Sequence, residues 1–186
     1  MGMLNITSTG GTFDPYIKYN AKAGRWYVKK DDKEQEIQNP VFVADFDNIK
    51  TGWILFLEGQ APSKVYDASI GNPAERPDEK HKRGFSLRMF SKAFGGVVEL
   101  SSSSMHLCAS IDDLYQQYDA GKASNKGMLP VVKYTGSTPM KDKMGTNYKP
   151  NFVIEKWVAR PAEFETSQDN TPVEAPAPKA AATSEF

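Results

Sequence analysis

The sequence predicts an all-β domain of barrel type that carries one α-helix and ends in a polar tail. Three observations support this prediction. Short runs rich in Val, Ile, Phe, Tyr and Trp recur between breaks that contain Gly, Pro or Asn, which is typical of strands and their turns. One segment, around residue 115, has apolar residues at helical spacing. Residues 168–186 are dominated by Pro, Ala, Thr, Ser and Glu and have little to bury.

The first predicted elements form an N-terminal β-hairpin. Residues 13–19 and 25–30 alternate in polarity, and residues 20–24 join them as a loop that closes on Gly24. Residues 53–57 are apolar on both faces, which is typical of a central strand. The other predicted strands are residues 41–46, 84–90, 97–101, 129–134 and 152–158. The long polar loops are predicted at residues 60–82 and 135–149.

The predicted helix begins at Ser110, a residue type that caps helix N-termini well. Asp112 and Asp113 then fall in the first turn, where the helix dipole favours negative charge. Gly121 is the expected C-terminal stop. The apolar face is formed by Ile111, Leu114, Tyr115 and Tyr118.

The predicted order is strands, one helix, then two strands. A five-stranded OB barrel carries its helix between the third and fourth strands, so the order fits an OB fold with an extra N-terminal hairpin and long loops. Other small β-barrels with one helix fit as well. We therefore expect a folded domain over residues 1–161 and a disordered, acidic, Pro- and Ala-rich tail over residues 162–186.

The charge is unevenly distributed along the chain. Lys and Arg number 23, and Asp and Glu also number 23, which gives no net charge. Residues 162–186 hold five of the acidic residues and one of the basic ones, which leaves 22 basic and 18 acidic residues in residues 1–161. A mildly basic body with an acidic tail is compatible with polyanion binding.

Several functional classes find little support in the sequence. The single cysteine, Cys108, allows no intrachain disulfide, and two histidines with one cysteine do not form a usual zinc set. No secretory leader, membrane-length apolar run, or phosphate- or dinucleotide-binding glycine motif is seen. We therefore expect a non-enzymatic protein of the cytoplasm with no cofactor. A metal-dependent nuclease that uses Asp45 and Asp47, two carboxylates on one strand face, is the enzymatic alternative.

Three predicted strands each place aromatic and basic residues on one face. Alternation separates these residues from a core face that includes Ile17, Trp26, Phe85, Leu87 and Met89. The residues on the outer faces are Tyr16 and Lys18; Arg25, Tyr27 and Lys29; and Arg88, Phe90 and Lys92. Lys and Arg neutralise phosphates, and exposed aromatic rings stack on bases for about 1–3 kcal/mol each. The combination predicts single-strand nucleic-acid binding.

The predicted loops add further candidate contacts. These are Lys22 in the hairpin turn, Arg83 at the end of the long excursion, Phe94 beside Gly95 and Gly96, and Tyr148 and Lys149 before the last strand. Trp26, Trp53 and Trp157 are instead expected in the core. Stacking and phosphate contacts serve DNA and RNA alike, so this pattern does not separate the two.

Several short phrases resemble the OB-fold single-stranded DNA-binding proteins of tailed bacteriophages, of the enterobacterial phage type. They lie at residues 13–19 (FDPYIKY), 23–27 (AGRWY), 51–53 (TGW), 82–85 (KRGF), 129–132 (LPVV), 150–152 (PNF) and 157–161 (WVARP). The resemblance spans residues 11–161. It implies sequence-independent binding of single-stranded DNA in phage replication, recombination or repair, in the cytoplasm of the infected host cell.

The resemblance also implies a role for the tail. Proteins of this function often end in an acidic segment with a terminal Phe that recruits replication or recombination proteins. The chain ends on Phe186, but the dense acidic run is missing. A virion scaffold or structural interaction protein is the alternative outside nucleic-acid binding.

Overall fold

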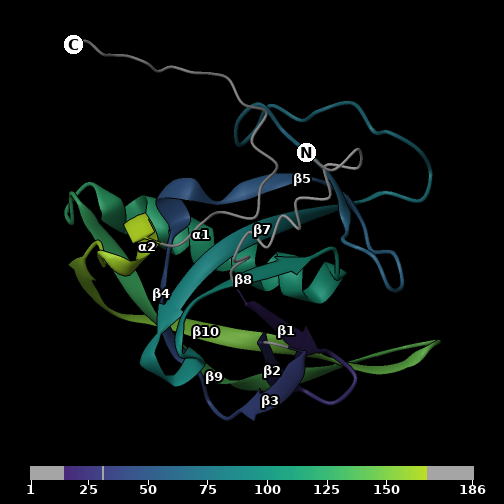
Figure 1. Cartoon of the computed structure of the whole chain (residues 1–186), viewed down its shortest axis with the longest axis horizontal. Helices are drawn as coiled ribbons and strands as arrows, with labels where there is room; N and C mark the ends of the chain where they lie inside the picture. Colours follow the sequence, from purple (N-terminus) through teal and green to yellow (C-terminus); the bar gives the residue numbers. More distant parts are fainter. Residues whose placement is uncertain (1–14, 31, 167–186) are drawn as a thin grey trace, which may run out of the picture.

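The computed structural model describes residues 15–30 and 32–166, and this part of the chain is mostly β-sheet (Figure 1). The strands are β1 Tyr16–Asn20, β2 Arg25–Lys30, β3 Lys33–Ile37, β4 Val41–Ala44, β5 Lys50–Leu55, β6 Ser63–Tyr66, β7 Lys82–Ser91, β8 Gly96–Ser102, β9 Met128–Asp142 and β10 Gly145–Ala159. The helices are α1 Met105–Lys122 and α2 Glu163–Thr166, with single 3₁₀ turns η1 Phe46–Asn48 and η2 Lys92–Phe94.

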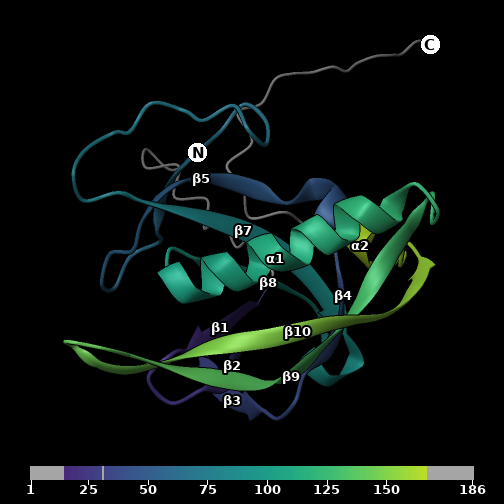
Figure 2. The same ribbon diagram turned by 180° about the vertical axis from the view of Figure 1, so that it is seen from behind.

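The strands pair in the order β10-β9-β4-β7-β8-β1-β2-β3, and β5 joins β7 and β6 beside this path. The pairing of β1 with β8 is parallel and the others are antiparallel, so the sheet is mixed. Seen from behind, α1 lies across the molecule between β7 and β10 (Figure 2). The prediction of a mostly β, barrel-like domain with an N-terminal hairpin and a helix between strands is confirmed at this level.

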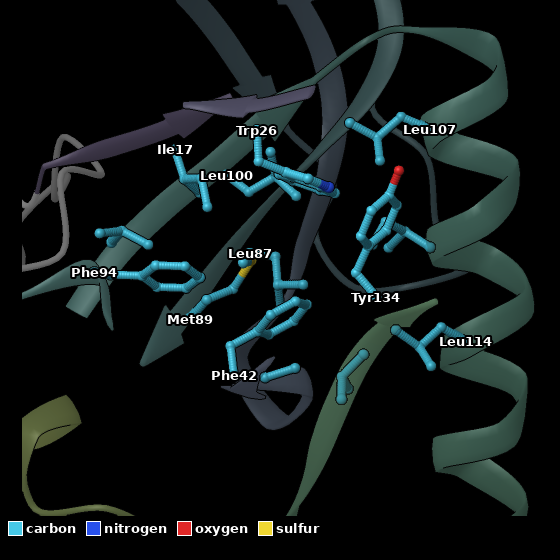
Figure 3. Close-up of a cluster of buried hydrophobic side chains, with 14 of the residues drawn as sticks. Ile17, Trp26, Phe42, Leu87, Met89, Phe94, Leu100, Leu107, Leu114 and Tyr134 are labelled. Carbon is cyan, nitrogen blue, oxygen red and sulfur yellow. The ribbon is translucent and has the colours of Figure 1, made fainter. Parts of the chain in front are cut away.

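The main core lies between the curled sheet and α1 (Figure 3). Trp26 is 1 % exposed and packs its ring 5.7 Å from that of Tyr134 and 5.9 Å from that of Phe152. These residues come from β2, β9 and β10, so the aromatic cluster joins the N-terminal hairpin to the last two strands. From the helix, Leu107, Ile111, Leu114 and Tyr118 are buried against the sheet.

The helix α1 begins earlier than the sequence predicts. Its N-cap is Ser104, and Ser110 lies inside the helix, so the predicted start at Ser110 is wrong. The hydroxyl of Ser110 donates to the carbonyls of His106 (3.0 Å) and Pro150 (2.7 Å), which attaches the helix to β10. The predicted apolar face is correct, because Ile111, Leu114 and Tyr118 are all buried.

The segment 135–149 is not the polar loop that the sequence predicts. It forms the outer arms of the β9–β10 hairpin, which projects beyond the body of the molecule in both views (Figures 1 and 2). Polar side chains are tolerated there because no residue of 135–149 is buried. Two register shifts interrupt the pairing of β9 with β10, because Thr135 of β9 and Glu155 of β10 each lack an opposite residue. Strands β3 and β6 were not predicted either.

The folded part of the chain extends past the boundary expected at residue 161. In α2, Phe164 is 2 % exposed and packs with Val97 and Leu129 in a second, smaller core that also contacts Phe90. Residues 167–186, with the predicted disordered tail and Phe186, lie outside the described residues. Within residues 15–30 and 32–166, no helix combines the length and apolarity needed to cross a membrane.

Candidate nucleic-acid interface

The outer face of β1 and β2 carries a chequered set of aromatic and basic side chains. In the antiparallel register, Tyr16 lies opposite Lys29, and Lys18 lies opposite Tyr27. Residues opposite each other in antiparallel strands point to the same face. The two tyrosines and two lysines therefore form one continuous patch, and the ammonium of Lys18 lies 5.8 Å from the centroid of the Tyr27 ring.

This patch is held rigid by the core beneath it. Ile17, Trp26 and Val28, the residues between the patch residues, are 2 %, 1 % and 5 % exposed. Above them Tyr16 is 40 % exposed and Lys18 keeps 59 % of its side chain exposed. The predicted alternation in both strands is thus confirmed: Tyr16, Lys18 and Lys29 are exposed on the outer face, and Tyr27 is half-buried there.

Strand β3 places carboxylates beside the patch. Glu34 pairs with Lys18 at 2.7 Å, and Glu36 approaches Arg25 at 3.4 Å. Sequence reasoning missed these pairs because it did not predict β3. Exposed ion pairs of this kind contribute only about 0–1 kcal/mol, so an incoming phosphate is able to replace the carboxylates.

The β1–β2 turn is attached to the base of the β9–β10 hairpin, which brings Tyr148 to the same region. The Tyr148 N–H donates to the Ala21 carbonyl (2.7 Å), and the Tyr148 carbonyl accepts from the Tyr19 hydroxyl (2.9 Å). Gly24 has φ +65°, and a Cβ built there would lie 3.4 Å from the Tyr148 ring. Lys22 is exposed on the same turn, and Lys149 pairs with Asp113 at 3.3 Å.

The outer face of β7 is not part of this open patch. Arg88 lies 5.5 Å from the ring of Phe164 and donates to the Phe164 carbonyl at 2.9 Å. The ring of Phe90 lies 6.4 Å from that of Phe164. Helix α2 therefore covers Arg88 and Phe90, two of the three β7 residues that the sequence assigns to binding, and no local pattern indicated that a segment more than seventy residues away would do so.

A buried polar network lies between the β1–β2 patch and the covered outer face of β7. Tyr16 pairs with Glu99 of β8, and Glu99 lies opposite Arg88 of β7, so the three strands do share a face. However, Lys64 of β6 lies over Glu99 at 2.7 Å, with only 9 % and 3 % of the two side chains exposed. Burial raises the pKa of the Tyr16 hydroxyl, and the negative charge of Glu99 adds to the effect.

Phe94 is not presented at a turn as expected. It is 4 % exposed, within η2, and its ring lies 6.2 Å from that of Phe42 in the core. The αL conformation of Gly95, with φ 80°, closes the 3₁₀ turn and directs the neighbouring Phe94 side chain inward rather than out. Lys92, at the start of the same turn, is exposed.

Arg83 belongs to a second aromatic–basic cluster, at the start of β7. Its guanidinium donates to both carboxylate oxygens of Asp67 (2.8 and 2.6 Å) and lies 5.2 Å from the ring of Trp53. Arg76 lies 5.3 Å from the same ring, and the Trp53 indole N–H donates to the Ala74 carbonyl at 2.8 Å. Trp53 is therefore partly buried and lies outside the two core clusters. The contact with Arg76 was not predicted, because Arg76 lies in a loop.

The two carboxylates of the nuclease alternative have separate structural partners. Asp45 is fully buried, and Arg160 donates to its two oxygens at 2.7 and 2.9 Å, which raises the pKa of the guanidinium. Asp47 accepts a hydrogen bond from the hydroxyl of Tyr118. Over residues 15–30 and 32–166, no group of three or more His, Cys, Asp or Glu is arranged to hold a metal ion. The geometry therefore gives the nuclease alternative no support.

His81 and Cys108, two further side chains of a chemically reactive type, are held in buried or partly buried positions. His81 is 5 % exposed and is held between Asp78 (2.8 Å) and Ser63 (3.0 Å). Burial raises the pKa of the Cys108 thiol to about 11, so the thiolate that a nucleophile needs is scarce at neutral pH.

Comparison with protein-family models, with curated proteins and with solved structures found no match in any of the three.

Proposed function

We propose that the protein binds single-stranded DNA without sequence preference, through the outer face of β1 and β2 and the adjoining base of the β9–β10 hairpin. The observation that carries the proposal is the β1–β2 register, which alternates Tyr16 and Tyr27 with Lys29 and Lys18 on the outer face of the sheet, above buried core residues. Aromatic rings stack on bases of any sequence, and the lysines between them neutralise phosphates. The resemblance to phage proteins supports a role in replication, recombination or repair in the infected cell.

The strand pairing supports an OB fold as the framework. Strand β4 pairs with β7 and β9, β7 with β8, and β9 with β10, while α1 lies between β8 and β9 along the chain. This pairing fits a five-stranded OB barrel to which β1–β3 are an addition. In this assignment β7 and β8 are the second and third barrel strands, whose face commonly binds oligonucleotides. Here Lys64 and α2 cover much of it, so the added hairpin supplies the open surface.

A titration of oligo-dT tests the proposal. Intrinsic Trp and Tyr fluorescence should report binding at micromolar protein, and the affinity should fall as salt rises. Tyr16→Ala and Tyr27→Ala should each weaken binding by about 5- to 150-fold, the equivalent of one lost stacking contact, with little change in salt slope. Lys29→Ala should flatten the salt slope by about 0.7 unit, the value for one phosphate contact on a single strand.

Lys126→Ala is the matched control for Lys29→Ala. It removes the same charge from an exposed lysine in the turn after α1, and it should leave affinity and slope close to wild type. RNA and duplex competitors measure the preference for single-stranded DNA. Absence of salt-dependent binding to oligo-dT would refute the proposal, and stable DNA-free assemblies seen by light scattering would favour a scaffold. Normal binding by both tyrosine variants would place the contact surface elsewhere.

A further inference from the structure

A cavity of about 470 Å³ lies between the β2–β3 hairpin and the η2 turn, on the side of β2 opposite to the chequered patch. It is lined by Val28, Lys30, Lys33, Gln35, Ile37, Lys92, Ala93, Phe94 and Gly95. Its volume is within the range of about 300–1,000 Å³ that small-molecule sites occupy. The predicted binding residues include only Lys92 and Phe94 from this set.

The cavity has an apolar floor and a cationic rim. Val28, Ile37 and Phe94 are 5 %, 9 % and 4 % exposed and belong to the main core. The rim carries Lys30 and Lys33 from the two strands of the hairpin and Lys92 from η2. No acidic residue is among the described residues that line the cavity, unlike the chequered patch, where Glu34 and Glu36 accompany the basic groups.

The fold places Lys30, Lys33 and Lys92 around the same cavity. Lys30 and Lys33 lie directly opposite each other in the β2–β3 register. Like charges at such a position destabilise a strand pair. The ammonium of Lys30 reaches toward the η2 turn, where a Cβ built on Gly95 would lie 3.9 Å from it. Positive charge is thus concentrated around one opening, and an anion bound there would relieve the repulsion.

We propose that this cavity binds a nucleotide, with its phosphate on Lys30, Lys33 and Lys92 and its base or sugar against the apolar floor. The nucleotide is either one unit of a bound strand or a free nucleotide, because both present a phosphate beside an apolar ring. The first source rests on the proposed function and requires the strand to pass around β3, which is the edge of the sheet. The second source does not depend on single-strand binding.

The test uses the full chain with two single variants, Lys33→Ala and Lys92→Ala, and Lys126→Ala as the charge-matched control. Thermal melting first establishes that all three fold like the wild type. Calorimetric titration with thymidine monophosphate, and separately with inorganic phosphate, reports the free-nucleotide source. Oligo-dT of increasing length, titrated at several salt concentrations, reports the strand source.

If the cavity takes a free nucleotide, each cavity variant weakens thymidine monophosphate binding about tenfold, while Tyr27→Ala and Lys126→Ala bind it like wild type. If it takes a unit of the strand, the monophosphate is not bound, and each cavity variant weakens long oligo-dT only and flattens the salt slope by about 0.7. Wild-type behaviour of both variants toward every ligand overturns the proposal. If inorganic phosphate binds as tightly as thymidine monophosphate, the apolar floor does not contact the base or sugar, and that part of the proposal is overturned. Failure of oligo-dT binding alone counts against the proposed function and leaves the monophosphate result standing.

Discussion

Replacement of Phe164 by alanine tests whether α2 is part of the folded domain. The side chain is 2 % exposed and contacts the second core formed with Val97 and Leu129. A buried Phe→Ala change costs about 3–5 kcal/mol. Because α2 lies near the end of the described chain and can detach, the loss cannot exceed the free energy with which this segment docks. We therefore expect the lower end, a decrease of about 3 kcal/mol in the free energy of unfolding.

Urea denaturation followed by tryptophan fluorescence measures this loss. With a typical slope of about 1–3 kcal/mol per molar urea, the midpoint should fall by about 1–3 M. Phe164→Leu is the control, since it keeps most of the apolar volume and should cost less than about 1.5 kcal/mol. Oligo-dT affinity should stay near wild type in both variants, because the proposed surface lies on β1 and β2. A loss below about 1 kcal/mol in Phe164→Ala would refute the docking of α2.

Two further predictions concern the β5–β7 region. Hydrogen bonds from Arg83, and to a smaller extent from Thr51 and the Ala74 N–H, hold the pKa of Asp67 well below its ordinary value of 3.8. The ionised carboxylate therefore stabilises the fold above pH 3.8, and this contribution is lost as the pH falls below that value. Asp67→Asn should flatten the fall in urea midpoint between pH 5 and pH 2, and an unchanged profile would contradict this. A Cβ on Gly52 would lie 2.3 Å from the Val65 carbonyl oxygen, so Gly52→Ala should lower the free energy of unfolding by about 1–3 kcal/mol, and a wild-type urea midpoint would show that the two strands are not so close in solution.

Local periodicity predicted the parts of the fold that depend on one strand at a time. The alternation in β1, β2 and β7 placed Ile17, Trp26 and Leu87 in the core correctly, because a strand directs successive side chains to opposite faces. The helix face was also correct. Its start was not, because the helix begins after Ser104, whose side chain makes no capping hydrogen bond, so a rule based on capping side chains does not locate it.

The candidate site was harder to predict because it depends on contacts between distant segments. Strand β3 (KEQEI) is polar by composition and forms through backbone pairing with β2, so neither the strand nor its Glu34 and Glu36 were foreseen. The covering of Arg88 by Phe164 depends on a contact 76 residues away in sequence. Individual residue types therefore indicated stacking and phosphate contacts, while tertiary structure decided which of them face solvent together.

The irregularity of β10 has a consequence for the behaviour of many copies of the protein at high concentration. An uninterrupted edge strand is a template on which another chain can add a strand and start an aggregate. In β10, Pro150 has no N–H to donate, the Tyr148 N–H already donates to the Ala21 carbonyl, and Glu155 is an extra residue that interrupts the regular pairing. A neighbouring molecule finds only short stretches with free, aligned donors and acceptors. At high concentration, edge-to-edge pairing of β10 between molecules, and the aggregation that follows from it, is therefore disfavoured.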